Sequence, residues 1–336
     1  MTKLVHLARE KPEPGVFTGV FLKALDEFGG VAFLEDAAGM PDERKAEAIR
    51  PYPVLLTCWS SAATPACLAA DPGKLSYVCN VTGTVRHWVP LEIVEAGIPV
   101  TNWGDAPAQS VAEGAVALLL ATLKDLHERI RIVRDGDWGV DPHTHGGSLD
   151  GLAVGVYGLG VIGRRFVEML RPFRPVLYAF DPYVEDMPEG VTRVGSLEEL
   201  FDKSQAVVIH AGLSDETRNS VTADLLARLP DHGVVVNTAR GGVIDQAALL
   251  AELKSGRLRA GLDVLEPDVM PPGHPARTWP NVILSCHSIE NGWPDDRKPP
   301  TKLQRMHEIC IENLRSFFAG RPLRFRMDRD RYLRST

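Results

Sequence analysis

A glycine-rich hexapeptide, Gly158–Gly163, has the pattern GxGxxG. A β-branched stretch with Val154 and Val156 precedes it and an amphipathic stretch follows it, as a strand–turn–helix unit requires. In such a unit the first glycine makes the tight turn, the second lets the backbone approach a pyrophosphate, and the third lets the helix pack on the strand. The free N–H groups at the start of the helix attract the anion. The hexapeptide therefore predicts a dinucleotide site.

A carboxylate, Asp181, ends the next predicted strand, about 20 residues after the glycine turn, which is the spacing that dinucleotide folds use. A carboxylate at this place accepts hydrogen bonds from the adenosine ribose hydroxyls and repels a 2′-phosphate. The two signals together predict NAD rather than NADP. The alternative interpretation is a structural glycine turn with an unrelated, exposed aspartate.

Three further polar side chains follow predicted buried strands. Arg240 lies in NTARGGVID, Asp263 in GLDVLEPD and His287 in NVILSCHS. Open α/β sheets bind ligands at the carboxyl ends of their strands, and an arginine, a carboxylate and a histidine there would bind an oxyanion and transfer a proton. Taken singly, His287 is also compatible with a core histidine and Arg240 with a surface ion pair.

The elements that must position these residues are short apolar runs alternating with helical patterns. This alternation predicts βαβ units, and hence parallel sheets with helices on both faces. The predicted strands are 54–56, 77–79, 98–100, 153–156, 176–179, 206–209, 234–236 and 282–284. The predicted helices include 161–170, 196–201, 223–229 and 246–254, and the longest runs from about residue 108 to 134.

Composition limits the class of protein. The chain has 336 residues, 44% of them hydrophobic and 24% charged, which suits a soluble globular protein of one large or two smaller domains. The net charge of -7 argues against nucleic acid as a partner. Five cysteines without a CxxC pair favour the reducing cytoplasm. The longest apolar run, 115–123, is about half of the 20 residues that a membrane span needs, and the N-terminus lacks a signal-peptide pattern.

These blocks resemble the D-isomer-specific 2-hydroxyacid dehydrogenase family. His210 in VVIHAGLSDET, the SVAE start of the long helix and FFAGRPL near the C-terminus extend the resemblance to roughly residues 52–323. The resemblance implies an α/β fold in which a Rossmann NAD-binding domain, 106–289, is inserted into a flavodoxin-like substrate-binding domain, 1–105 and 290–336. It implies an oxidoreductase that interconverts a 2-oxo acid and a (D)-2-hydroxy acid by hydride transfer to or from NAD, with homodimer contacts on the long helix.

The resemblance also implies roles for individual residues. Arg240 matches the arginine that holds the substrate carboxylate and carbonyl oxygen, which suits the planar guanidinium fork. His287 matches the proton donor for the new hydroxyl group. The backbone of Gly83 and Thr84 matches the one that binds the substrate carboxylate. The residues implied to bind the cofactor are Gly158, Gly160, Val161, Ile162, Gly163, Asp181, His210, Ala211, Thr217, Thr238, Ala239, Arg240, Asp263 and His287.

Three positions depart from the family pattern. The partner of the catalytic histidine is a glutamate in most relatives, whereas the position five residues after Asp263 holds Asp268, one methylene shorter. We predict Asp268 as the partner and keep Glu266 as the alternative. Arg86, beside the predicted substrate loop, either adds a positive charge near an anionic substrate or belongs to a structural ion pair, and we favour the ion pair. Cys286 replaces the usual proline before the histidine and is expected to be an inert, buried thiol.

Two other functions remain open at this stage: a dinucleotide-sensing protein like the corepressors that share this fold, and a relative that oxidises formate or phosphite. The histidines of the 141–145 segment, His143 and His145, resemble a metal-binding pair. No cysteine or second cluster of ligands stands near them in the sequence, so we expect no metal.

Overall fold

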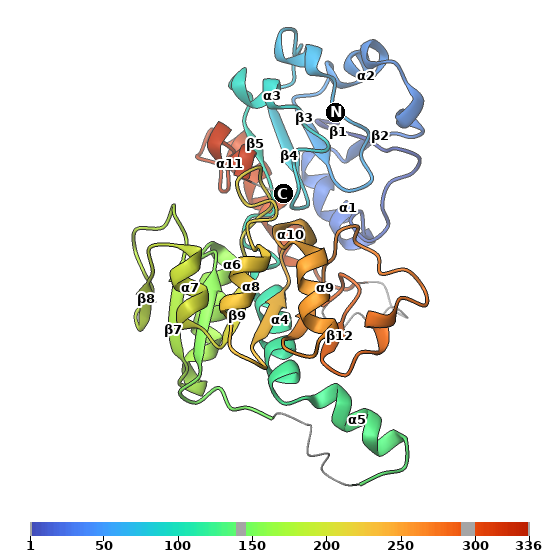
Figure 1. Cartoon of the computed structure of the whole chain (residues 1–336). Helices are drawn as coiled ribbons and strands as arrows, with labels where there is room; N and C mark the ends of the chain where they lie inside the picture. Colours follow the sequence, from blue (N-terminus) through green and yellow to red (C-terminus); the bar gives the residue numbers. More distant parts are fainter. Residues whose placement is uncertain (1, 139–145, 290–299, 335–336) are drawn as a thin grey trace. The chain divides into compact units, whose positions relative to one another are not determined.

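The computed structural model describes residues 2–138, 146–289 and 300–334 (Figure 1). The chain forms two compact units. Unit 1 comprises Met1–Ala106 and Pro294–Thr336, and unit 2 comprises Pro107–Trp293. The chain thus leaves unit 1, builds unit 2 and returns to unit 1.

Unit 1 contains a five-stranded parallel sheet with the strand order β2-β1-β3-β4-β5. The strands are β1 (Leu4–Leu7), β2 (Val31–Leu34), β3 (Val54–Thr57), β4 (Tyr77–Asn80) and β5 (Val100–Thr101). The α-helices are α1 (Gly19–Leu25), α2 (Asp42–Ile49), α3 (Leu91–Glu95), α10 (Arg305–Phe318) and α11 (Arg329–Arg334), with 3-10 turns η1 (Asp26–Phe28), η2 (Ala37–Gly39) and η3 (Ala66–Ala69). Because side chains alternate along a strand, Leu4 and Val5 enter separate apolar clusters.

Unit 2 contains a seven-stranded parallel sheet with the order β12-β11-β10-β9-β6-β7-β8. The strands are β6 (Ala153–Tyr157), β7 (Val176–Phe180), β8 (Val191–Arg193), β9 (Ala206–Ile209), β10 (Val234–Asn237), β11 (Arg259–Leu262) and β12 (Val282–Leu284). The chain winds outward from β6 to one edge, returns to β9 and continues to the other edge. This is the doubly wound order of dinucleotide-binding folds, and its reversal between β6 and β9 is where such sheets bind ligands.

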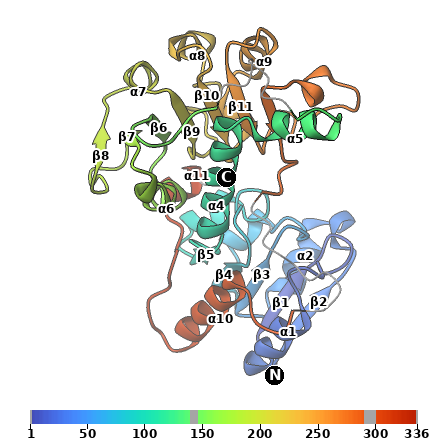
Figure 2. The ribbon, with the colours of Figure 1, turned by 90° about the horizontal axis from the view of Figure 1, so that it is seen from below.

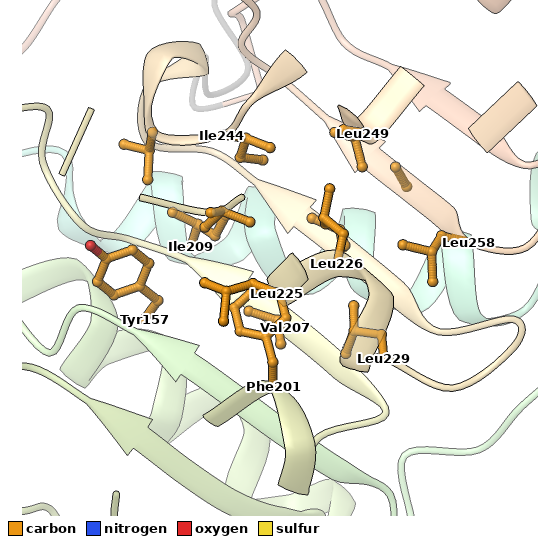
Figure 3. Close-up of a cluster of buried hydrophobic side chains, with 14 of the residues drawn as sticks. Tyr157, Phe201, Val207, Ile209, Leu225, Leu226, Leu229, Ile244, Leu249 and Leu258 are labelled. Carbon is orange, nitrogen blue, oxygen red and sulfur yellow. The ribbon is translucent and has the colours of Figure 1, made fainter. Parts of the chain in front are cut away.

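Helices cover both faces of this sheet, as Figure 2 shows. They are α4 (Ala108–Leu123), α6 (Val161–Leu170), α7 (Leu197–Lys203), α8 (Ala223–Arg228) and α9 (Gln246–Lys254), with 3-10 turns η4 (Arg171–Phe173), η5 (Gly241–Val243) and η6 (Pro275–Thr278). Helix α5 (Leu126–Arg134) follows α4 and extends away from the sheet (Figure 1). Residues of α4 and α6 pack in one apolar cluster. Residues of α7, α8 and α9 pack in the other, where Leu225 and Leu226 meet Phe201 and Val207 (Figure 3).

The strands predicted from the sequence are present, although only Val100 of the run 98–100 lies in a strand, β5. The predicted ranges do not include β1, β2, β8 or β11, and of these only β11 is implied, by the place expected for Asp263. The prediction of one helix from 108 to 134 is wrong. The chain breaks at Asp125, which has a φ of 48° in the left-handed region, and α5 starts after it. The Asp125 carboxylate pairs with Arg259 at 3.2 Å, and each side chain is only 9% exposed. This buried ion pair explains the break.

Two buried histidines of unit 1 should make its stability depend on pH. Burial lowers the pKa of His6 and of His307 to about 4. In the unfolded chain both would titrate near 6.5, so the unfolded state binds more protons as the pH falls from 6.5 to 4. The free energy of unfolding should therefore be highest above pH 6.5, where both histidines are neutral in either state. It should decrease by up to about 3 kcal/mol per histidine as the pH falls to 4.

Urea unfolding of the wild type and of His6→Gln at several pH values between 7 and 4 measures this loss. The variant should lose less stability over this range than the wild type. His87→Gln, at an exposed histidine of the same unit, should behave like the wild type. Equal losses in His6→Gln and the wild type would contradict the assignment.

Candidate active site

The glycine turn of unit 2 has the geometry that a dinucleotide requires. Gly158 has a φ of +95°, and a Cβ there would lie 2.7 Å from the backbone nitrogen of Ala211. A Cβ on Gly163 would lie 2.1 Å from the Gly158 carbonyl oxygen, so the helix packs closely on the turn. Gly160 precedes α6 and faces open space, with no atom within 4 Å of its Cβ position. The start of α6 is therefore accessible to a pyrophosphate, and the turn fits the cofactor.

The Asp181 carboxylate lies directly at this turn. Its Oδ2 accepts a hydrogen bond of 2.8 Å from the Leu159 N–H, and its Oδ1 accepts one of 2.9 Å from the Tyr183 N–H. Two backbone donors hold the carboxylate beside the glycine turn.

His210 follows β9 and lies under the glycine turn. Its ring packs against Phe166 with a centroid distance of 4.9 Å, and its Nε2 is buried with no partner among the described residues. Burial lowers the pKa of His210 to about 3, so the ring is neutral at physiological pH. Thr217 stabilises the loop that follows His210. Its hydroxyl donates a hydrogen bond to the Gly212 carbonyl at 2.7 Å and accepts one from the Ser214 N–H at 2.7 Å.

Asn237 shapes the turn after β10, a role that the sequence analysis did not assign. Its Oδ1 accepts from the Ala239 N–H at 3.0 Å, and its Nδ2 donates to the Arg240 carbonyl at 2.9 Å. The Arg240 side chain is half-buried, and its Nη1 donates to the Ala239 carbonyl at 2.7 Å. Thr238 is 8% exposed, with a buried hydroxyl that has no partner in the described part of the chain. A polar atom of this kind fits a ligand that supplies the missing hydrogen bond.

Asp263, at the end of β11, organises the turn that carries His287. One oxygen, Oδ1, accepts from the Ser285 hydroxyl at 2.7 Å and from the N–H groups of Ser288 and Ile289 at 3.0 and 3.2 Å. The His287 N–H donates to the Asp263 carbonyl at 2.6 Å. Within residues 2–138, 146–289 and 300–334, Oδ2 has no hydrogen-bond partner, so this oxygen can accept from a carboxamide. Nothing in the sequence singles out Ser285 for this role.

His287 and Asp268 form a hydrogen-bonded pair between Nδ1 and Oδ2. The Leu265 N–H donates to the other Asp268 oxygen at 3.1 Å, and the two side chains of the pair are 41% and 45% exposed. Nε2 of His287 has no partner among the residues described, so it can face a substrate. Glu266, the alternative partner, instead lies 3.6 Å from Nη1 of Arg218.

The backbone around His287 is strained. Both Cys286 and His287 have a positive φ, 58° and 51°, a region that non-glycine residues rarely adopt. Residues with a strained backbone occur preferentially at functional sites. The turn also exposes Cys286, so the expectation of a buried thiol is wrong.

In unit 1, Gly83 and Thr84 follow β4. The amide of Asn80 donates to the Thr84 carbonyl at 3.0 Å, and that of Asn102 donates to the Gly83 carbonyl at 2.9 Å. With both carbonyls bonded, the N–H groups of Gly83 and Thr84 have no acceptor among the described residues and are available to an anion.

Two neighbours define this loop further. A Cβ on Gly83 would lie 2.6 Å from the Trp103 indole nitrogen, so only glycine fits here. Arg86 is exposed, and its Nη1 donates to the Leu333 carbonyl of α11 at 3.2 Å. The partner is thus a carbonyl oxygen and not the carboxylate that an ion pair requires. The expectation of an ion pair is therefore wrong, and Arg86 instead makes a structural hydrogen bond.

Among the described residues, no group of three or more His, Cys, Asp or Glu side chains is arranged to hold a metal ion. His143 and His145 lie outside the described residues. No helix in the described part of the chain is long and apolar enough to span a bilayer.

Comparisons with known proteins identify the family to which this fold belongs. A family model, the NAD-binding domain of D-isomer specific 2-hydroxyacid dehydrogenases, matches residues 116–288. A glyoxylate reductase of Korarchaeum cryptofilum is 30% identical over 327 residues, which cover 95% of this chain and 94% of the relative. A D-3-phosphoglycerate dehydrogenase of Methanocaldococcus jannaschii is 32% identical over 79% of this chain, and the match covers 50% of that protein. The solved 2-hydroxyacid dehydrogenase of Ketogulonicigenium vulgare Y25 has a TM-score of 0.77 and 27% identity, covering 98% of this chain and 99% of that one.

The doubly wound sheet, the glycine turn with its aspartate and the histidine–carboxylate pair define a dinucleotide-dependent oxidoreductase. Together with the comparisons, they show that the chain belongs to the D-isomer specific 2-hydroxyacid dehydrogenase family. It is an NAD-dependent enzyme that interconverts 2-oxo acids and 2-hydroxy acids by hydride transfer. The named relatives are reductases and dehydrogenases, which favours this function over a corepressor-like sensor.

Proposed function

We propose that the enzyme reduces a small anionic 2-oxo acid, with His287 as proton donor, Asp268 as its partner and Arg240 as the substrate-binding cation. The observation that carries this proposal is the His287–Asp268 hydrogen bond, which leaves Nε2 of the imidazole open. The bound nicotinamide supplies the hydride to C2 of the substrate. The protein supplies the position of the acid and the charges around it.

The proton transfer follows from this arrangement. With Nδ1 held by Asp268, protonated His287 presents its Nε2–H to the C2 oxygen and donates the proton as the hydroxyl forms. The Asp268 carboxylate fixes the orientation of the ring and stabilises its positive charge. Arg240 binds the substrate carboxylate and carbonyl oxygen through its planar fork, and the N–H groups of Gly83 and Thr84 bind the carboxylate.

We assign the cofactor contacts by the same reasoning. The glycine turn and the start of α6 hold the pyrophosphate, and Asp181 binds the adenosine ribose. Asp263 offers Oδ2 to the nicotinamide carboxamide. The complete proposed set is Gly158, Gly160, Val161, Ile162, Gly163, Asp181, His210, Ala211, Thr217, Thr238, Ala239, Arg240, Asp263 and His287.

The test is a steady-state assay of NADH loss with a panel of 2-oxo acids, from glyoxylate and hydroxypyruvate to larger aromatic oxo acids. Turnover with at least one of them is the expected result. Tight NADH binding without turnover of any would support the sensor alternative. Turnover with formate or phosphite alone, in a parallel assay of NAD reduction, would support the anion-oxidising alternative.

Replacing Asp181 with serine should change cofactor preference. The wild type should use NADH with a much higher kcat/KM than NADPH, because the carboxylate binds the ribose hydroxyls and repels the 2′-phosphate. Asp181→Ser should narrow this preference by about tenfold or more, mainly by weakening NADH. Asp150→Asn, which removes a surface carboxylate paired with Arg174, should leave the ratio unchanged. Equal kcat/KM for both cofactors in the wild type would reject the assignment.

We also propose that the protein is a cytoplasmic homodimer that binds no nucleic acid. The net charge of -7 opposes a nucleic-acid partner, and all five cysteines are free, as in a reducing compartment. On α5, Leu126, Ile130 and Val133 are 48%, 42% and 49% exposed. They lie three or four residues apart and so form one apolar stripe, the type of surface that a second subunit covers.

The dimer is tested by the mass of the protein in solution. Sedimentation should give twice the chain mass of 36.8 kDa for the wild type, and Ile130→Glu should shift the species toward the monomer. Glu168→Gln, a substitution on the exposed side of α6, serves as the control. A monomeric wild type at micromolar concentration would disprove the proposal.

A further inference from the structure

The first side chain of α9, Gln246, bonds the backbone of the loop that carries Asp268. Its Nε2 donates to the Glu266 carbonyl at 2.9 Å, and its Oε1 accepts from the Glu266 N–H at 2.8 Å. A carboxamide can donate and accept at the same time, whereas a carboxylate can only accept and an ammonium only donate. Gln246 therefore binds both backbone polar groups of Glu266, its N–H and its carbonyl, as a neighbouring β-strand would.

The same loop lies directly on the turn that carries Arg240. A Cβ on Gly241 would lie 2.0 Å from the carbonyl carbon of Leu265, so backbone packs on backbone at this point. One residue further along, Gln246 braces Glu266, and two residues after that Asp268 reaches His287. The loop is thus fixed between the close contact at Leu265 and the two hydrogen bonds at Glu266.

We propose that Gln246 is a positioning residue for proton transfer, because it fixes the loop from which Asp268 holds Nδ1 of His287. The inference rests on the proposed function and deepens it. Nothing in the side chain of Gln246 contacts His287 or Asp268, so its effect passes through the backbone of residues 266–268. The precision of a hydrogen bond between two half-exposed side chains depends on how rigidly their backbones are held.

The test is Gln246→Met, which keeps the length of the side chain and removes both hydrogen-bonding groups. The matched control is Gln205→Met. Gln205 also accepts a backbone N–H, that of Ala153 at 3.2 Å, but it lies at the amino end of β6 and away from the site. Three quantities are compared: kcat for oxo-acid reduction across pH, the Kd of NADH, and the far-downfield NMR signal of the imidazole N–H proton bonded to Asp268.

We expect Gln246→Met to lower kcat about tenfold and to move the alkaline decline of the rate to lower pH, because a looser Asp268 stabilises the protonated imidazole less. The imidazole signal should broaden or disappear, while the Kd of NADH stays within twofold. Gln205→Met should match the wild type in all three quantities.

An unchanged imidazole signal and pH profile in a folded Gln246→Met protein would overturn the proposal, even if its Tm were lower, because a purely structural brace would reduce Tm alone. The NMR signal needs no substrate. It therefore tests the positioning role even if no 2-oxo acid is turned over, and the two failures can be told apart.

Discussion

Asp268→Asn is expected to slow oxo-acid reduction by about 10²–10⁴-fold in kcat, the range for impaired general acid catalysis. The substitution keeps the shape of the side chain and removes its charge. Without that charge the protonated form of His287 is less stable, so the rate at a given pH falls and its alkaline decline moves to lower pH. The oxidation of the hydroxy acid needs the neutral ring, so its rise with pH should move in the same direction. A pH series of kcat in both directions measures the two effects.

The control for this prediction is Glu266→Gln. The Glu266 carboxylate lies near Arg218 and is not bonded to His287, so the pH profile of this variant should follow the wild type. A shifted profile in Glu266→Gln together with an unshifted one in Asp268→Asn would make Glu266 the partner of the histidine.

The parts of the site that the sequence predicts are those held by local structure. The glycine turn depends on steric limits within six residues, and Asp181 depends on the length of one βαβ unit. His287 follows β12, whose β-branched run is easily recognised, whereas Asp268 is predicted by counting five residues from Asp263 in the family pattern. Each of these residues belongs to a recognisable motif or follows one at a known spacing, and this is why the sequence predicts it.

The parts that the sequence did not predict depend on contacts between distant segments. The break at Asp125 is stabilised by Arg259, 134 residues away, and nothing in the helical pattern indicates that ion pair. Ser285 donates a hydrogen bond to Asp263, 22 residues earlier in the chain, and Gln246 accepts one from Glu266, 20 residues later. No sequence motif links either pair. In the sequence, such a polar residue cannot be distinguished from a solvent-exposed one, because its hydrogen-bond partner is known only from the fold.

Arg240→Lys is the second substitution expected to have a large effect. Lysine keeps the positive charge and loses the planar fork that binds two oxygen atoms at once. We expect the KM for the oxo acid to rise and kcat to fall, so that kcat/KM decreases by about 10²-fold or more, the cost of losing a preorganised donor at the reacting oxygen. Steady-state kinetics with the best substrate of the panel measures the change.

NADH binding separates this role from the alternatives. If Arg240 acts on the substrate, its replacement by lysine should leave the Kd of NADH, measured by fluorescence titration, within twofold of the wild type. Arg218→Lys is the matched control: its guanidinium lies 3.6 Å from the Glu266 carboxylate and is half-exposed, so the kinetic constants should change less than threefold. A collapse of NADH affinity in Arg240→Lys would mean that Arg240 acts mainly in cofactor binding or in the folding of the turn, and not mainly on the substrate. Wild-type kinetics in that variant would remove the arginine fork from the proposed mechanism.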